Sequence, residues 1–211
     1  TMSSKSSVYI HGTSSEEQAR LSLLNDLLNE RSLDTLNLKG GERILDVGSG
    51  LGQFSRAMAR VVGKKGKVLG IERDENQIFQ ANSYAKAANE ESLVEFRQGN
   101  ALDLPLTQNE WETFDIVHTR FVLEHVPNPE AIVAQMVKAA KPGGTIILAD
   151  DDHSTCRATP DCPGFQTLWD AYCRSYDRLG NDPYVGRNLV TLLHQSGAQK
   201  IQNGLFFFGD C

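Results

Sequence analysis

A glycine-rich segment after the first apolar run of the chain has the residue types needed to hold a nucleotide-like ligand. The segment spans residues 46–52 (DVGSGLG) and precedes an expected helix. Glycine permits positive φ and close approach of the backbone to a ligand, and a helix N-terminus offers free N–H groups. Glu72 ends the second apolar run, where a carboxylate can accept from both hydroxyls of an adenosine ribose. Dinucleotides and S-adenosylmethionine both require this arrangement.

Two details of the segment distinguish these ligands. A dinucleotide fingerprint reads G-x-G-x-x-G, and Gln53 stands where its third glycine would be. Asp46, directly before the glycines, would repel a diphosphate and attract the ammonium and sulfonium groups of a methionine derivative. The segment therefore favours S-adenosylmethionine over NAD.

The elements that must position this segment alternate along the chain. Apolar runs predict strands over 43–47, 67–71, 93–97, 114–118 and 145–150. Between them, apolar residues recur at helical spacing, Asp74 and Asn128 are suited to cap helices, and residues 141–144 (KPGG) are expected to form a turn. Such alternation is typical of a doubly wound, mostly parallel α/β sheet with helices on both faces. Ligands bind at the carboxyl ends of its strands.

Further segments surround this core. We expect an N-terminal helix over 14–30 within a lid of residues 1–38, and the cofactor-binding core over 39–152. Residues 153–211 are expected to complete the same domain with helices over 165–179 and 189–195 and a strand over 200–208, and the native chain could extend beyond Cys211.

The composition excludes several kinds of partner. The chain has 211 residues, 40% of them hydrophobic, which fits one globular domain. Its net charge of −6 gives no counterion release on a nucleic acid. No apolar run approaches the length of a membrane span, and no signal sequence opens the chain. The four cysteines form no C-x-x-C pair, which favours a cytoplasmic location.

The motifs and their order resemble those of class I S-adenosylmethionine-dependent methyltransferases of the small-molecule type, which have a Rossmann-like fold. Residues 44–52 (ILDVGSGLG) resemble their motif I, and Glu72 matches the acid that closes their second strand. Residues 99–101 (GNA) resemble their usual Gly-Asp-Ala. Residues 119–125 and 141–145 resemble the segments after the fourth strand and before the fifth. The resemblance covers residues 9–150 and includes an N-terminal lid.

The resemblance implies a cofactor role for each matching residue. Asp46 and the glycines would face the methionyl part, Glu72 would hold the ribose, Asn100 would bond the adenine, and Thr119 would take the ammonium through its carbonyl. Asn100 departs from the usual Asp, but its amide can accept from N6 and donate to N1. The expected cofactor-binding residues are Tyr9, Asp46, Gly48, Gly50, Gly52, Gln53, Glu72, Arg73, Gln77, Asn100, Ala101, Thr119 and Arg120.

Catalytic residues are harder to select, because methyl transfer from a sulfonium depends mainly on alignment and exclusion of water. A general base is needed only where the acceptor keeps its proton at neutral pH. The candidates near the strand ends and in the lid are His125, Asp152, His153, Tyr9 and His11. The acids at 150–152 could hold a cation, but Arg120 would repel one, so no metal is expected.

The aromatic side chains of Trp169, Tyr172 and Tyr176 recur at helical spacing, and they either pack in the core or form a wall of the acceptor pocket.

The sequence thus predicts an enzyme that moves a methyl group from S-adenosyl-L-methionine to an O, N or C atom of a small molecule, leaving S-adenosyl-L-homocysteine. We expect a monomer or homodimer with neither nucleic acid nor membrane as partner. Two alternatives stay open: an NAD-dependent oxidoreductase on the same sheet, and a module that binds S-adenosylmethionine without turnover.

Overall fold

Residues 15–206 are described in the computed structural model, with side chains from residue 25 onward. The chain divides into two units, one ending at Leu38 and the other beginning at Lys39. The first unit contains helix α1 (Ser15–Leu36), which runs past the expected end at residue 30. Tyr9 and His11, two of the predicted site residues, lie outside the described residues.

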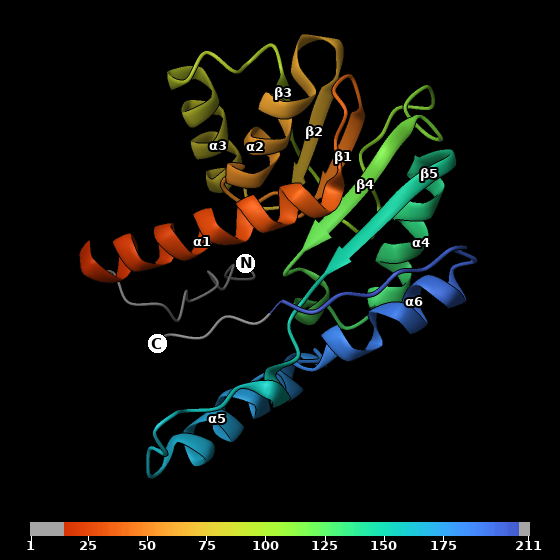
Figure 1. Ribbon diagram of the computed structural model, residues 1–211. Helices are drawn as coiled ribbons and strands as arrows, with labels where there is room; N and C mark the ends of the chain where they lie inside the picture. Colours follow the sequence, from red (N-terminus) through yellow and green to blue (C-terminus); the bar gives the residue numbers. More distant parts are fainter. Residues whose placement is uncertain (1–14, 207–211) are drawn as a thin grey trace, which may run out of the picture. The chain divides into compact units, whose positions relative to one another are not determined.

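Within the described part of the second unit, one sheet contains five parallel strands in the order β3-β2-β1-β4-β5. The strands are β1 (Arg43–Val47), β2 (Lys67–Glu72), β3 (Val94–Gln98), β4 (Phe114–Arg120) and β5 (Ala140–Ala149). The chain runs from β1 outward to β3 and then returns to place β4 on the other side of β1 (Figure 1). The predicted doubly wound sheet is confirmed, and its order reverses between β1 and β4, where such sheets bind ligands.

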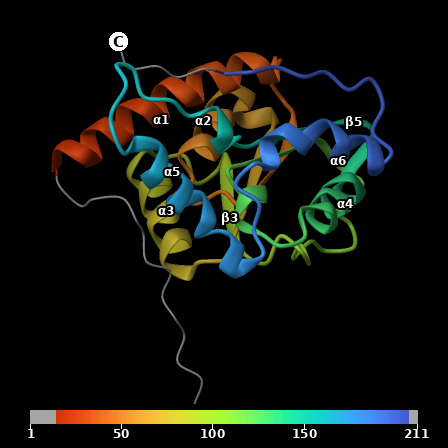
Figure 2. The same ribbon diagram turned by 90° about the horizontal axis from the view of Figure 1, so that it is seen from below.

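The described part of this unit contains five α-helices, and those between the strands pack against the sheet in two groups. The five helices are α2 (Gln53–Val62), α3 (Glu75–Ala87), α4 (Pro129–Ala139), α5 (Phe165–Arg174) and α6 (Leu189–Gln195). Helices α2 and α3 pack against β2 and β3, and α4 packs against β4 and β5. Helix α6 lies beside α4 (Figure 2). No helix within residues 15–206 is long and apolar enough to cross a membrane.

Helix caps form where the sequence predicts them. The Asp74 carboxylate accepts from the backbone N–H groups of Asn76 and Gln77 at the start of α3. The Asn128 side chain accepts from Ala131 N–H at the start of α4, with Pro129 in the first turn. Both side chains satisfy donors that have no partner within the helix.

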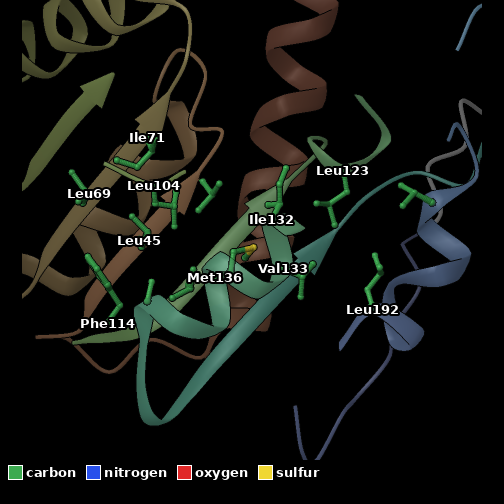
Figure 3. Close-up of a cluster of buried hydrophobic side chains, with 14 residues drawn as sticks. Leu45, Leu69, Ile71, Leu104, Phe114, Leu123, Ile132, Val133, Met136 and Leu192 are labelled. Atoms are coloured by element: carbon green, nitrogen blue, oxygen red, sulfur yellow. The ribbon is translucent and has the colours of Figure 1, made fainter. Parts of the chain in front are cut away.

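The core joins the sheet to the segment that follows it. Leu45, Ile71 and Phe114 of the strands pack with Ile132 and Met136 of α4 (Figure 3). Val185 and Leu192, from beyond β5, belong to the same buried cluster. The residues after β5 therefore help to fill the core of this unit.

Two predicted boundaries were wrong. The segment expected as a turn, residues 141–144, is part of β5, with an irregular register against β4 between Phe114 and Ile116. Gly143 takes a φ of 78° there, so the glycines bend the strand without ending it. The strand expected over 200–208 is absent from 200–206, where Gly204 interrupts the run and Leu205 is exposed.

The helix expected over 165–179 is also shorter. Helix α5 ends at Arg174, and a separate 3₁₀ turn, Asp177–Leu179, follows it. Other short 3₁₀ turns are Gly63–Lys65, Leu123–His125, His153–Thr155 and Val185–Asn188.

Candidate active site

The glycine loop between β1 and α2 is held by backbone hydrogen bonds to β2. The N–H groups of Gly48 and Ser49 both donate to the Ile71 carbonyl, at 2.8 and 2.9 Å. Gly48, Gly50 and Gly52 all have positive φ. A Cβ on Gly48 would lie 2.2 Å from Val122 Cγ2, so the loop lies directly against the segment that follows β4.

Glu72 lies beside this loop at the end of β2. Its Oε2 accepts from Gly50 N–H at 3.1 Å. Its Oε1 accepts from the N–H groups of Arg73 and Asp74, at 2.8 and 3.0 Å. Gln77 Oε1 would lie 3.2 Å from a Cβ on Gly50. The structure therefore brings together Glu72, Gln77 and the glycine loop, as the sequence predicts.

The donors of the loop are largely used within the protein. Gly48 and Ser49 donate to Ile71, Gly50 donates to Glu72, and Gly52 donates to the Ser49 carbonyl at 2.9 Å. A diphosphate binds in such loops through several free N–H groups. The loop instead offers a half-buried carboxylate, which would repel phosphate and can accept from ribose hydroxyls. This arrangement fits the adenosine part of S-adenosylmethionine.

Asp46 lies beneath the loop and faces the interior. Its side chain accepts from Ser55 Oγ at 2.5 Å and bonds His118 Nδ1 at 2.8 Å, and the residue is 3% exposed. Burial would raise the pKa of Asp46, but the bond and charge of His118 hold it below its usual value. Both carboxylate oxygens of Asp46 thus have partners within the protein, and its expected contact with the methionyl group stays a prediction.

Arg120 and Thr119 end β4 next to Asp46. The Arg120 guanidinium lies over the Phe54 ring, 4.6 Å from its centroid, and is attracted by the Asp46 carboxylate. Thr119 Oγ1 donates to the Val47 carbonyl at 2.8 Å, so its side chain ties β4 to β1. The structure thus brings these two predicted residues to the end of β1, with the Thr119 side chain buried.

The remaining predicted cofactor residues lie at the surface of the same edge. The Asn100 side chain accepts from Leu102 N–H at 3.0 Å, and Asn100 is exposed after β3. Ala101 is half-buried, whereas Arg73 and Gln53 are exposed. These positions lie at the strand and helix ends where the resemblance places an adenosine.

A buried polar cluster follows β4 and β5, and Glu124 is its centre. Glu124 is 4% exposed, and its Oε2 bonds His153 Nε2 at 2.7 Å and accepts from Tyr176 OH at 3.1 Å. Its Oε1 lies 3.3 Å from His125 Nε2. Tyr176 OH also bonds Tyr172 OH at 3.0 Å. The sequence singled out the histidines and tyrosines but missed the carboxylate that joins them, although an acid within VLEHV is itself a signal.

Two nearby aspartates have structural partners. Asp152, a predicted base, pairs with the Arg187 guanidinium at 2.8 and 3.0 Å and caps the turn His153–Thr155. Arg187 and Ser154 hold the pKa of Asp152 below its usual value against the effect of burial, which disfavours a role as base. The Asp150 carboxylate accepts from the N–H groups of Val122 and Leu123 at 3.2 and 2.8 Å. Burial, reinforced by Glu124, raises the pKa of Asp150 to about 7.

The same cluster offers metal-ligand atoms. One atom each from Glu124, Asp151 and His153 lie within 4.8 Å of one another. We do not assign them as metal ligands, because His153 Nε2 and the Tyr176 hydroxyl already bond the Glu124 carboxylate.

Comparison with known proteins identifies the family. A model of the methyltransferase domain matches residues 38–182. The chain is 32% identical over 192 residues to a demethylmenaquinone methyltransferase of Bacillus cereus (strain ATCC 10987 / NRS 248), covering 85% of this chain and 79% of that relative. It is 27% identical over 200 residues to a demethylmenaquinone methyltransferase of Desulfitobacterium hafniense (strain Y51), covering 90% and 76%.

A solved structure shares the fold. The crystal structure of a SAM dependent methyltransferase from Aquifex aeolicus superposes with a TM-score of 0.59 at 21% identity, covering 80% of this chain and 78% of that chain. The chain therefore belongs to the methyltransferase domain family. It is an enzyme that uses S-adenosylmethionine to methylate a small molecule, which confirms the prediction from sequence. The NAD-dependent alternative is not favoured.

Proposed function

We propose that the cofactor lies across the carboxyl ends of β1 and β2, with its ribose hydroxyls on Glu72. The hydrogen bond from Gly50 N–H to the Glu72 carboxylate is the main support for this proposal. It occupies an N–H group that a diphosphate would need, and it holds a negatively charged carboxylate where the diphosphate would have to bind. The three N–H bonds of Glu72 fix the orientation of the carboxylate before the ligand arrives. When bound, S-adenosylmethionine supplies the methyl group.

We further propose that the acceptor is a quinone-type ring in its reduced form. Two relatives, at 32% and 27% identity over most of the chain, are named demethylmenaquinone methyltransferases. The aromatic side chains that surround the polar cluster support a flat ring as the acceptor: Trp169 stacks on Phe165 and on Tyr172, with ring centroids 5.9 and 5.0 Å apart. Aromatic pairs in such geometries attract other flat rings.

The acceptor is tested by assaying the purified protein with S-adenosylmethionine and reduced demethylmenaquinone. We expect methylated product by mass spectrometry, with one S-adenosylhomocysteine formed per methyl transferred. The oxidised quinone serves as the matched control and should give no product, because its ring carbon is electron-poor. Equal turnover of both forms, or of neither, would reject the reduced ring as acceptor.

We also propose that the enzyme acts in the cytoplasm as a monomer or homodimer, without a nucleic-acid partner. Three of its cysteines, Cys156, Cys162 and Cys173, are free thiols, as is usual in a reducing compartment. The net charge of −6 disfavours binding to a polyanion.

A further inference from the structure

We propose that His153 is the general base of methyl transfer and that Glu124 is its positioning residue, with the free lone pair on His153 Nδ1. The inference rests on the proposed function, since a base is needed only where the acceptor carries a hydroxyl that keeps its proton at neutral pH. A reduced quinone ring carries such hydroxyls.

The hydrogen bonds assign the tautomer of His153. An ionised carboxylate only accepts hydrogen bonds, so the 2.7 Å contact between Glu124 Oε2 and His153 Nε2 places the proton on Nε2. In the neutral ring, Nδ1 then holds the lone pair. Among the described residues, none hydrogen-bonds Nδ1, so this nitrogen is available to take a proton from a ligand.

The remaining contacts hold Glu124 and His153 in place. Tyr176 OH donates a second hydrogen bond to Glu124, and Trp169 Nε1 donates to the His153 carbonyl at 2.6 Å. The rings of Trp169, Tyr172 and Tyr176 surround the imidazole with centroids 5.4 to 5.8 Å away. Despite these contacts, the His153 side chain keeps 12% of its surface exposed.

The segment that carries Glu124 passes directly beside the glycine loop. Val122 contacts the loop at Gly48, and Glu124 follows two residues later in the same segment. Asp150 fixes this segment to the end of β5 by accepting from Val122 and Leu123 N–H. His153 comes from just beyond β5, so the base and the loop share one edge of the sheet.

His153 Nδ1 takes the proton of a ring hydroxyl, and the electron pair of that O–H bond moves into the ring. A ring carbon forms a bond to the methyl group while the bond from methyl to sulfur breaks, and its electron pair stays on sulfur. The imidazolium returns its proton to the ring oxygen as the methylated carbon loses its own proton to water. One proton is released for each methyl transferred.

Charges around His153 favour the protonated imidazole. Glu124, Asp150 and Asp151 surround it as acids. Burial would lower the pKa of His153, but the bond and charge of Glu124 raise it above its usual value. His125 lies on the other side of Glu124, and burial raises the pKa values of Tyr172 and Tyr176, so both phenols stay neutral.

The first test is the kinetics of matched variants. We expect His153→Gln to lower kcat about 100-fold or more, since a positioned base contributes about 10²–10⁴. His194→Gln, the same change at an exposed histidine of α6, should leave kcat unchanged. Both variants should bind S-adenosylhomocysteine as the wild type does. A His153→Gln enzyme with the kcat of the wild type would overturn the proposal.

The second test is the pH dependence of kcat in Glu124→Gln. Because the base must be neutral, kcat should fall as pH drops through the pKa of His153. Loss of the carboxylate lowers that pKa, so the acid limb should move to lower pH while the plateau also falls. If the acid limb of Glu124→Gln stays where it is in the wild type, Glu124 does not act through His153 and the proposal is wrong. This test does not use His153→Gln, so it remains decisive even if that variant does not fold.

A third test does not need the acceptor. At a pH above the pKa of His153, nitrogen-15 NMR of the histidine rings should show a neutral His153 ring with its proton on Nε2. A proton on Nδ1 would overturn the proposal even if reduced demethylmenaquinone proves to be the substrate. Conversely, the Nε2 tautomer would support the His153–Glu124 pair even if reduced demethylmenaquinone is not methylated. The test therefore separates an error in the proposed acceptor from an error in the proposed base. Loss of turnover after treatment with EDTA would indicate a metal at these residues and also reject the proposal.

Discussion

At the scale of residues, three carboxylates at one edge of the sheet have different environments and so different roles. Asp46 is buried and bonds His118 and Ser55, so it stabilises the end of β1 from within. Glu72 is half-buried and bonds backbone N–H groups alone, which leaves it able to accept from ribose hydroxyls as well. Glu124 is buried and bonds side chains, including Tyr176 from a segment distant in sequence. Burial and partners, more than residue type, decide which carboxylate meets a ligand.

Gly52, at the start of α2, is predicted to contribute to stability through its small size and its positive φ. Gly52→Ala would place a Cβ 2.3 Å from Phe96 Cζ at a φ of 73°. Gly164→Ala is the matched control, because Gly164 has the same left-handed conformation with nothing within 4 Å of its Cβ position. The control should lose about 1–2 kcal/mol of unfolding free energy in urea, and Gly52→Ala about 1–3 kcal/mol more. Equal losses would show that the Phe96 contact relaxes without cost.

Asp150 is predicted to make stability depend on pH. Its pKa is about 7 in the folded protein against about 3.9 when unfolded, so the folded state binds more protons between these values. The stability that this group contributes is therefore present below pH 4 and is lost as pH rises through 7. The loss is on the order of 4 kcal/mol, because the two pKa values differ by about 3 units and each unit corresponds to 1.36 kcal/mol.

The matched variant for this prediction is Asp150→Asn, which keeps an oxygen to accept from Leu123 N–H but does not titrate. Unfolding by urea at a series of pH values should show the variant gaining stability relative to the wild type between pH 4 and 7. A difference that stays constant with pH would show that Asp150 is ionised throughout.

At the scale of elements, the sequence predicts best those strands, helix caps and loops whose structure depends on residues adjacent in sequence. The strands β1 to β4 were predicted within two residues at their ends, because each contains apolar residues at positions that face the core. The caps of α3 and α4 were predicted because capping depends on one side chain and the next three N–H groups. The glycine loop and Glu72 were predicted for the same reason, as a short motif and the end of the next strand.

Elements whose structure depends on distant partners were not predicted. The start of β5 contains KPGG, which is typical of a turn but lies within the strand, between the pairs that Ala140 and Thr145 form with β4, where the register is irregular. The apolar run at the end of the chain resembles a strand, but no neighbouring strand pairs with residues 200–206. The polar cluster joins Glu124 to His153, 29 residues away, and to Tyr176, 52 residues away, and no local pattern reveals such contacts.

Helix α6 is predicted to contribute to the core as strongly as the helices between strands. Leu192 is buried against this core, so Leu192→Ala should cost about 2–5 kcal/mol. Leu168→Ala on α5 is the control, since Leu168 is 72% exposed and its loss should change stability by less than about 0.5 kcal/mol. The midpoint of urea unfolding measures both, and a small loss at Leu192 would mean that α6 is dispensable for this core.

At the scale of the whole molecule, one edge of the parallel sheet gathers all the described chemistry. The carboxyl ends of β1 and β2 present the glycine loop and Glu72, and the ends of β4 and β5 lead to Glu124 and His153. The glycine loop and Glu72 thus lie on one side of the point where the strand order reverses, between β1 and β4, and Glu124 and His153 follow the strands on the other side. We therefore expect cofactor and acceptor to meet at this reversal, with the cofactor on the β1–β2 side.

The proposed cofactor site requires above all that Glu72 binds the ribose of S-adenosylmethionine. Isothermal titration calorimetry with S-adenosylhomocysteine should show binding to the wild type, and NAD should show none. Glu72→Gln should weaken binding by about 1.5–3 kcal/mol for each charge-assisted bond lost, whereas Glu75→Gln, the same change at an exposed residue of α3, should not alter it. An unchanged dissociation constant in Glu72→Gln, or binding of NAD in place of S-adenosylhomocysteine, would contradict the account.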